Sequence, residues 1–160
     1  MASLSTKPLF RPRTVALYRR LASSMKRNAT AVWNGTIKEG HGTLTTKSKT
    51  LDETQYSFKS RFEQGTGTNP EELIAAAHAG CFTMQLTANL TEAGYTADEL
   101  TSTCEVSLDD GAITQSRIEV KGKVPNCSEE EFEKHLRHAE KNCPVSKLLD
   151  TNIEVSFSFG

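Results

Sequence analysis

Two of the four cysteines stand where a thiol could do chemistry. Cys81 lies in an apolar stretch, and Cys143 precedes Pro144 at the end of a predicted helix, where a backbone bend can present a thiol. A free thiol has a pKa of about 8.5, and burial in apolar surroundings raises that pKa further. A reactive Cys81 therefore needs a cation nearby. Taken alone, Cys81 fits a buried packing residue better than a reactive thiol, and Cys143 fits both equally.

The remaining cysteines and the histidines do not predict a second reactive thiol or a metal site. Cys104 falls on the inward face of a predicted strand and Cys127 in a turn, so both are interpreted as bystanders. His135, His138 and Cys143 could be imagined as zinc ligands, but a fourth ligand and a C-x-x-C pair are missing. We therefore expect no metal. Four cysteines in 160 residues are also too few for a disulfide scaffold and suit a reducing compartment.

A long helix must position Cys81. Asn69 is a good N-cap, Pro70 suits the first helical position, and Glu72 stands where a capping box places its acidic residue. The pattern predicts a helix that continues to Ala93, about 36 Å long, with a glycine C-cap at position 94. Its N-terminal half is apolar and rich in small residues, so it should be buried on most sides. A second subunit could approach it closely.

The rest of the chain predicts an α+β fold with segregated helices. Short strands are predicted over 31–37, 41–47 and 56–62, the last from strict alternation that puts Arg61 on a polar face. Two strands and a helix capped by Ser128 follow the long helix, and residues 153–159 alternate as a final strand. The predicted order is three strands, helix, two strands, helix, strand.

Charge is distributed unevenly along the chain. The net charge is −1, which argues against a nucleic-acid binder, and no stretch approaches the roughly 20 apolar residues of a membrane span. The first 37 residues nevertheless hold seven of the 19 basic residues and no acidic residue. Together with its serines, this composition predicts that residues 1–30 are a transit peptide, for the mitochondrion in preference, and that residues 31–160 are the folded domain. The alternatives are a basic tail without a targeting role, or a helix that docks on a partner, in a cytoplasmic protein.

Three segments carry a resemblance to a known family. Residues 68–82 closely resemble the reactive-helix motif of the OsmC/Ohr family of thiol-dependent hydroperoxide reductases, and residues 142–146 resemble its second-cysteine motif. Residues 61–63 resemble the segment that carries the catalytic arginine in the OsmC branch, and His78 stands where the Ohr branch has tyrosine. Over residues 31–160 the resemblance implies antiparallel sheets wrapped around a long buried central helix, in an intertwined homodimer.

The resemblance also implies a role for each residue. Cys81 would reduce an organic hydroperoxide and become a sulfenic acid, and Cys143 would then close a disulfide with it. Arg61 would keep Cys81 anionic and stabilise the leaving alkoxide, while Glu71 would hold the guanidinium. An external dithiol, which in this family is usually of the lipoyl type, would reduce the disulfide. The resemblance implies no prosthetic cofactor. Near Phe62, Phe82 and Met84 an apolar pocket would favour alkyl or lipid hydroperoxides.

One spacing predicts the homodimer from a physical argument. Glu71 and Cys81 are ten residues apart, which is about 15 Å along a helix, too far for one Arg61 to bridge within a chain. If two copies of the helix pack antiparallel, Glu71 of one copy approaches Cys81 of the other. We therefore expect active sites that straddle the interface, with each Glu71 serving the partner's arginine.

Two rival functions remain open from sequence. A cysteine hydrolase or transferase could use Cys81 with His78, three residues earlier on the same helix, as its base. A non-catalytic module could keep the fold and use its apolar cleft for a small ligand.

Overall fold

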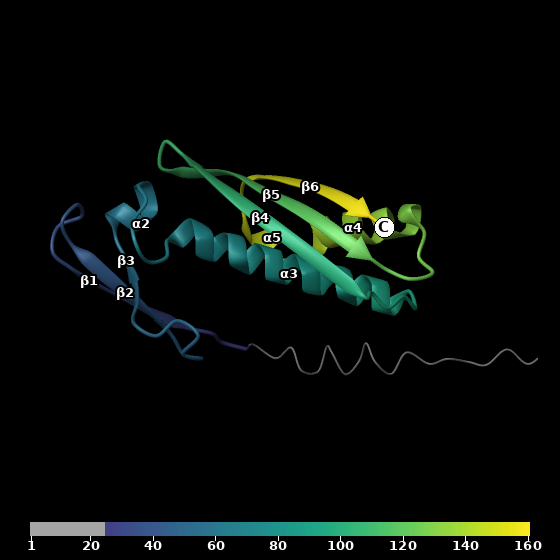
Figure 1. Ribbon diagram of the computed structural model, residues 1–160, viewed down its shortest axis with the longest axis horizontal. Helices are drawn as coiled ribbons and strands as arrows, with labels where there is room; N and C mark the ends of the chain where they lie inside the picture. Colours follow the sequence, from purple (N-terminus) through teal and green to yellow (C-terminus); the bar gives the residue numbers. More distant parts are fainter. Residues whose placement is uncertain (1–24) are drawn as a thin grey trace, which may run out of the picture.

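The computed structural model describes residues 25–160, which form an α+β fold built around one long helix (Figure 1). The first 24 residues of the predicted transit peptide lie outside the described residues. The elements, in chain order, are β1 (Ala29–Asn34), β2 (His41–Thr46), β3 (Thr54–Tyr56), α2 (Phe58–Phe62), α3 (Pro70–Glu92), β4 (Glu99–Asp109), β5 (Ala112–Lys123), α4 (Glu129–Asn142), α5 (Pro144–Leu148) and β6 (Asn152–Phe159).

Helix α3 begins and ends as its sequence predicts. The Asn69 side chain accepts a hydrogen bond from the Glu72 backbone N–H, and Pro70 occupies the first turn. Gly94, at φ +90°, follows the last turn in the left-handed region that favours glycine. Only half of the predicted capping box forms, because the Glu72 carboxylate accepts instead from the Thr68 hydroxyl at 2.9 Å. At 23 residues the helix is about 35 Å long.

Two three-stranded sheets lie at different parts of this helix (Figure 1). The sheet β1-β2-β3 is antiparallel, as expected, and stands at the N-terminal end of α3. The sheet β4-β5-β6 covers one side of α3 and is mixed, since β4 and β5 pair antiparallel whereas β6 pairs parallel with β5. Helices α4 and α5 form the crossover that a parallel pair requires.

The core lies between α3, the second sheet and α4. Its fully buried members come from all three and include Phe82, Leu86, Ile118, Phe132 and Leu136. The opposite side of α3 is uncovered in the single chain, so the expectation that this helix is buried on most sides is wrong for one chain. Its exposed small and apolar residues are Ala76, Ala77, Gly80, Met84 and Ala88, which we call the α3 stripe.

The segment before α3 differs from its prediction. Residues 56–62 were expected to continue as a strand, but β3 ends at Tyr56 and the short helix α2 follows. Ser57 and Ser60 form a complete capping box that starts this helix. Phe58 and Phe62 then pack with ring centroids 4.8 Å apart, a one-turn contact. The alternation of apolar and polar residues in this segment is compatible with a strand. The serine capping box and the four-residue spacing of the two phenylalanines favour a helix instead.

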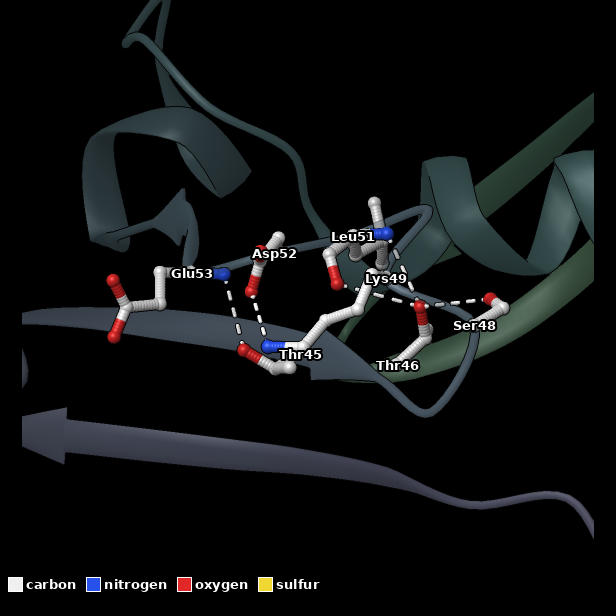
Figure 2. A network of polar contacts seen from close by, with 7 residues as sticks. All are labelled: Thr45, Thr46, Ser48, Lys49, Leu51, Asp52 and Glu53. Atoms are coloured by element: carbon white, nitrogen blue, oxygen red, sulfur yellow. Dashed lines mark hydrogen bonds and ion pairs between the residues drawn. The ribbon is translucent and has the colours of Figure 1, made fainter.

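The loop that precedes β3 is closed by its own hydrogen bonds (Figure 2). The Leu51 N–H donates to the Thr46 hydroxyl, which donates back to the Leu51 carbonyl. Lys49 and Asp52 form an ion pair at 2.7 Å across the same loop. These bonds hold the start of β3, and therefore the entry to α2, in one position.

Candidate active site

The structure brings Cys81 and Cys143 together. Cys81 lies half-buried in the middle of α3, and Cys143 lies fully buried between α4 and α5. The two thiols are close enough for Cys143 to hydrogen-bond with Cys81 and raise its pKa. Both cysteines are in the free thiol form.

Cys143 owes its position to the proline that follows it. The Cys143 N–H still donates to the Ala139 carbonyl at 2.8 Å, as in a last helical turn, but its backbone then turns to ψ 125°. Proline disfavours the α conformation in the preceding residue, so α4 must end here. Pro144 then starts α5, whose Val145 N–H faces Cys81.

Burial opposes ionisation of Cys81 in the single chain. Its pKa is raised, mainly by burial and then by the hydrogen bond with Cys143. The Val145 N–H partly offsets this increase, since a backbone donor favours the thiolate. Among residues 25–160 of the same chain, no lysine or arginine contributes to the shift. The described part of the chain therefore supplies two neighbouring thiols but no cation that lowers the pKa of Cys81.

Arg61 forms a bidentate pair with Glu71 of the same chain. Arg61 Nη2 donates to Glu71 Oε1 at 2.7 Å, and Arg61 Nε donates to both carboxylate oxygens at 3.2 Å. The hydrogen bonds from Arg61 lower the pKa of Glu71, and the carboxylate in turn raises the pKa of Arg61. The expectation that each Glu71 serves the partner's arginine is therefore wrong.

The reason is the turn between α2 and α3. The Ser60 hydroxyl donates to the Thr68 carbonyl at 2.9 Å, and the Asn69 side chain donates to the Ser60 carbonyl at 3.2 Å. These bonds fold α2 onto the first turn of α3, so the Arg61 side chain reaches Glu71 without a partner. Arg61 also lies over the Phe62 ring, 5.1 Å from its centroid.

Within one chain, the Arg61–Glu71 pair stays separate from Cys81. Glu71 is ten residues before Cys81 on a continuous helix, which places them about 15 Å apart along its axis. The structure thus presents two half-sites, a thiol pair and a guanidinium–carboxylate pair.

His78 does not pair with Cys81. Its ring is fully buried, with Nδ1 at 2.7 Å from the Ser116 hydroxyl and Nε2 at 2.8 Å from the Ser146 hydroxyl. Both nitrogens are therefore occupied, and burial lowers the pKa of the imidazole. The Cys81–His78 dyad that a hydrolase would need is not formed.

Ser116 and Ser146 were missed from the sequence. A signal existed for Ser116, because it shares the inward face of β5 with Ile118 and Val120, where a polar residue needs a partner. For Ser146 the helical turn after Cys143 gave no comparable signal.

The three residues expected to line a substrate pocket have different environments. Phe82 is fully buried in the core and offers no surface to a substrate, so its assignment needs correction. Phe62 and Met84 are 52% and 70% exposed, which leaves both available as apolar surface. Two surface hollows of residues 25–160 lie elsewhere, over β5 and β6.

Across residues 25–160, no three His, Cys, Asp or Glu side chains gather as a metal site would require. None of the helices in this part of the chain combines the length and the apolar character needed to cross a membrane.

Sequence comparison finds a matching family and curated relatives for this chain. The family described as OsmC-like protein matches residues 63–158. Peroxiredoxin OsmC of Escherichia coli strain K12 is 42% identical over 131 residues, which cover 79% of this chain and 92% of that protein. Organic hydroperoxide resistance protein-like 1 of Staphylococcus saprophyticus is 38% identical over 96 residues, which cover 58% of this chain and 68% of that protein.

Solved structures show the same fold. An OsmC-like protein from Mycoplasma pneumoniae matches with a TM-score of 0.68 at 16% identity, over 84% of this chain and 97% of that one. An organic hydroperoxide resistance protein from Elizabethkingia anophelis matches with a TM-score of 0.63 at 25% identity, over 87% and 98% of the two chains.

Proposed function

Because this chain belongs to the OsmC-like protein family, we propose that it is a thiol peroxidase that reduces organic hydroperoxides to alcohols. The observation that carries the proposal is the proximity of Cys81 and Cys143, since Cys81 packs against the core cluster that contains Cys143, at a break between two helices. Two adjacent thiols provide the two electrons that a hydroperoxide takes up. The peroxiredoxin relative at 42% identity supports the same chemistry.

The proposed reaction has two steps on the protein. The Cys81 thiolate attacks the distal oxygen of the hydroperoxide, the O–O bond breaks, and the alkoxide takes up a proton to leave as the alcohol. The Cys143 thiol then attacks the Cys81 sulfenic acid, the S–O bond breaks, and water leaves as the disulfide forms. An external dithiol, which we propose is of the lipoyl type, restores both thiols by exchange.

Thiolate formation is the step that one chain does not support, and a second copy supplies what is missing. The α3 stripe leaves small and apolar residues uncovered at the surface of the helix. A Cβ added at Gly80 would meet no described atom within 4 Å, so another backbone can approach closely there. Ala76 lies midway between Glu71 and Cys81, and both Ala76 and Gly80 are exposed.

A two-fold axis near Ala76 joins the two half-sites. If a second α3 crosses antiparallel at this residue, Glu71 lies opposite the partner subunit's Cys81. The Arg61 guanidinium, held on Glu71 by three hydrogen bonds, then faces that thiol and stabilises its anionic form. The same guanidinium stabilises charge on the leaving alkoxide. We propose this obligate homodimer, in which each Arg61–Glu71 pair acts as a unit on the other subunit.

The proposal also covers the class of hydroperoxide that is reduced and the compartment in which the protein acts. The exposed Phe62 beside Arg61 and the exposed Met84 one turn beyond Cys81 give the assembled site apolar walls, which suit alkyl or lipid hydroperoxides. The basic segment 1–30 supports a mitochondrial location, where lipoyl dithiols serve as reductants. N-terminal sequencing of the protein from cells tests the location, and an uncleaved cytosolic chain would contradict it.

The deciding experiment is mass spectrometry after one equivalent of tert-butyl hydroperoxide. We expect one disulfide, between Cys81 and Cys143, and no other cysteine pair. Cys81→Ser should abolish peroxide consumption, whereas Cys127→Ser, in the half-buried turn before α4, should leave it unchanged. If Cys81→Ser still consumed the hydroperoxide, the protein would be better described as a ligand-binding module on the same fold.

A further inference from the structure

A buried hydrogen bond joins the central helix to the segment that carries the second thiol. His78 Nε2 lies 2.8 Å from the Ser146 hydroxyl, and Ser146 stands three residues after Cys143. The other ring nitrogen lies 2.7 Å from the Ser116 hydroxyl on β5, which in turn lies 3.3 Å from Cys104 Sγ. His78 is thereby fixed to the sheet on one side and to α5 on the other.

Apart from Val145, which packs half-buried against the core, helix α5 has few side chains that hold it in place. It is one turn long, spans Pro144–Leu148, and Ser146 is its only buried residue. Leu148 is 78% exposed, and the Lys147 side chain bonds only to Asn142 of the preceding helix. A segment with so few buried groups opens easily unless a specific contact closes it. The His78–Ser146 bond is that contact.

The position of α5 bears directly on disulfide formation. A disulfide needs its sulfur atoms about 2.05 Å apart and its Cα atoms within about 7 Å. In this step Cys143 Sγ attacks Cys81 Sγ, the S–O bond of the sulfenic acid breaks, and the hydroxyl leaves as water with the thiol proton. A thiol held in contact reacts as an intramolecular partner, whereas a mobile one loses that advantage.

We propose that His78 and Ser146 are positioning residues that hold Cys143 against Cys81, and so set the rate of disulfide formation without affecting attack on the peroxide. This inference rests on the proposed function. It assigns the buried imidazole a task other than that of a base, in accord with its two occupied nitrogens. It also gives a function to a polar side chain that is fully buried on the core-facing side of α3.

The test uses Ser146→Ala in the full-length protein. Alanine is small and a better helix former than serine, so α5 is retained while the hydroxyl is lost. The matched control is Ser102→Ala. The Ser102 hydroxyl accepts a hydrogen bond from Thr83 at 2.7 Å and likewise joins α3 to a neighbouring element, but this element is β4, not α5. Ser146→Thr restores the hydroxyl.

Two rates are measured after one equivalent of tert-butyl hydroperoxide without reductant. The first is peroxide loss, and the second is disulfide formation, with dimedone added to trap the sulfenic acid. In Ser146→Ala we expect unchanged peroxide loss, disulfide formation about tenfold slower, as for one lost buried hydrogen bond, and a strong dimedone adduct on Cys81. Ser102→Ala and Ser146→Thr should behave as the wild type.

The outcomes separate this inference from the proposed function. Equal slowing of both rates in Ser146→Ala, no change in either, or the same defect in Ser102→Ala or Ser146→Thr would overturn the positioning role. A wild-type protein that forms no Cys81–Cys143 disulfide would instead overturn the proposed function.

Discussion

Arg61 Nη2 lies 2.7 Å from Glu71 Oε1 of its own chain, and this pair stands ten residues away from Cys81 along one helix. The guanidinium is thus held in place by the chain that carries it, away from the Cys81 thiol of that chain. The following predictions test the consequences of this separation.

Glu71→Gln removes the carboxylate that holds Arg61. We expect kcat/KM for an organic hydroperoxide to fall by about 10²-fold, because the guanidinium loses its position over the reacting sulfur. Stability should change by less than about 1 kcal/mol, since the Arg61 side chain is 38% exposed and the pair is screened by water. Asp52→Asn is the matched control, because it breaks the 2.7 Å pair with Lys49 in the β2–β3 loop. Equal loss of activity in both variants would contradict the prediction.

Mixed dimers test whether the sites are shared. A dimer of one Glu71→Ala chain and one Cys81→Ser chain should regain one intact site, and about half the wild-type activity. A dimer of one wild-type chain and one chain with both substitutions should have no intact site. The reverse result, activity only in the second mixture, would place each site within one subunit.

Ala76→Arg puts a long cation on the α3 stripe. We expect sedimentation to show a folded monomer with peroxidase activity reduced by at least 10²-fold, because Cys81 loses the arginine that activates it. Thr91→Arg, exposed in the last turn of the same helix, should leave both the dimer and the activity intact. A monomer of Ala76→Arg with full activity would refute the assembled site.

The pH profile should depend on Arg61. Burial raises the pKa of Cys81, so the thiolate fraction, and with it the peroxidase rate, rises with pH up to that pKa. In the dimer that we propose, the guanidinium of Arg61 would oppose this effect. Arg61→Gln should therefore shift the rising limb of log kcat/KM to higher pH and slow the reaction at pH 7. If the limb keeps its position, Arg61 does not act on the thiolate.

Burial of His78 predicts a stability that depends on pH. Its folded pKa is lowered, so the unfolded chain binds more protons between the folded and unfolded pKa values. Stability is then complete above the unfolded pKa of about 6.5 and is lost as pH falls below it, by at most about 1.4 kcal/mol per pH unit. Urea unfolding between pH 5 and 7.5 measures this slope. His78→Gln should flatten it, whereas His138→Gln, exposed on α4, should not.

Local signals account for the parts of the fold that the sequence predicted well. Asn69, Pro70 and Gly94 define both ends of α3 by backbone chemistry that needs no tertiary context. The alternation in β6 likewise predicts a half-buried strand, but not that it pairs parallel to β5. Pairing direction depends on where the crossover returns the chain, which no local pattern encodes.

The parts that were missed depend on contacts between distant residues. Residues 56–62 fit both a strand and a short helix, and the bonds of Ser60 to Thr68 and Asn69 are what place Arg61 on Glu71. Phe82 resembles a pocket residue because it follows Cys81, but the next residue on a helix points about 100° away, here into the core. The partners of His78 lie 38 and 68 residues away along the chain.

If the proposed disulfide forms, the complete burial of Cys143 decides which of its sulfur atoms a reductant can reach. An incoming dithiol collides only with sulfur that the solvent reaches, and of the two bonded atoms this is the one on α3. We therefore expect the transient adduct with the reductant to form on that helix, with the inner sulfur as leaving group. The Cys81 sulfur would then both attack the hydroperoxide and be the atom that the reductant attacks.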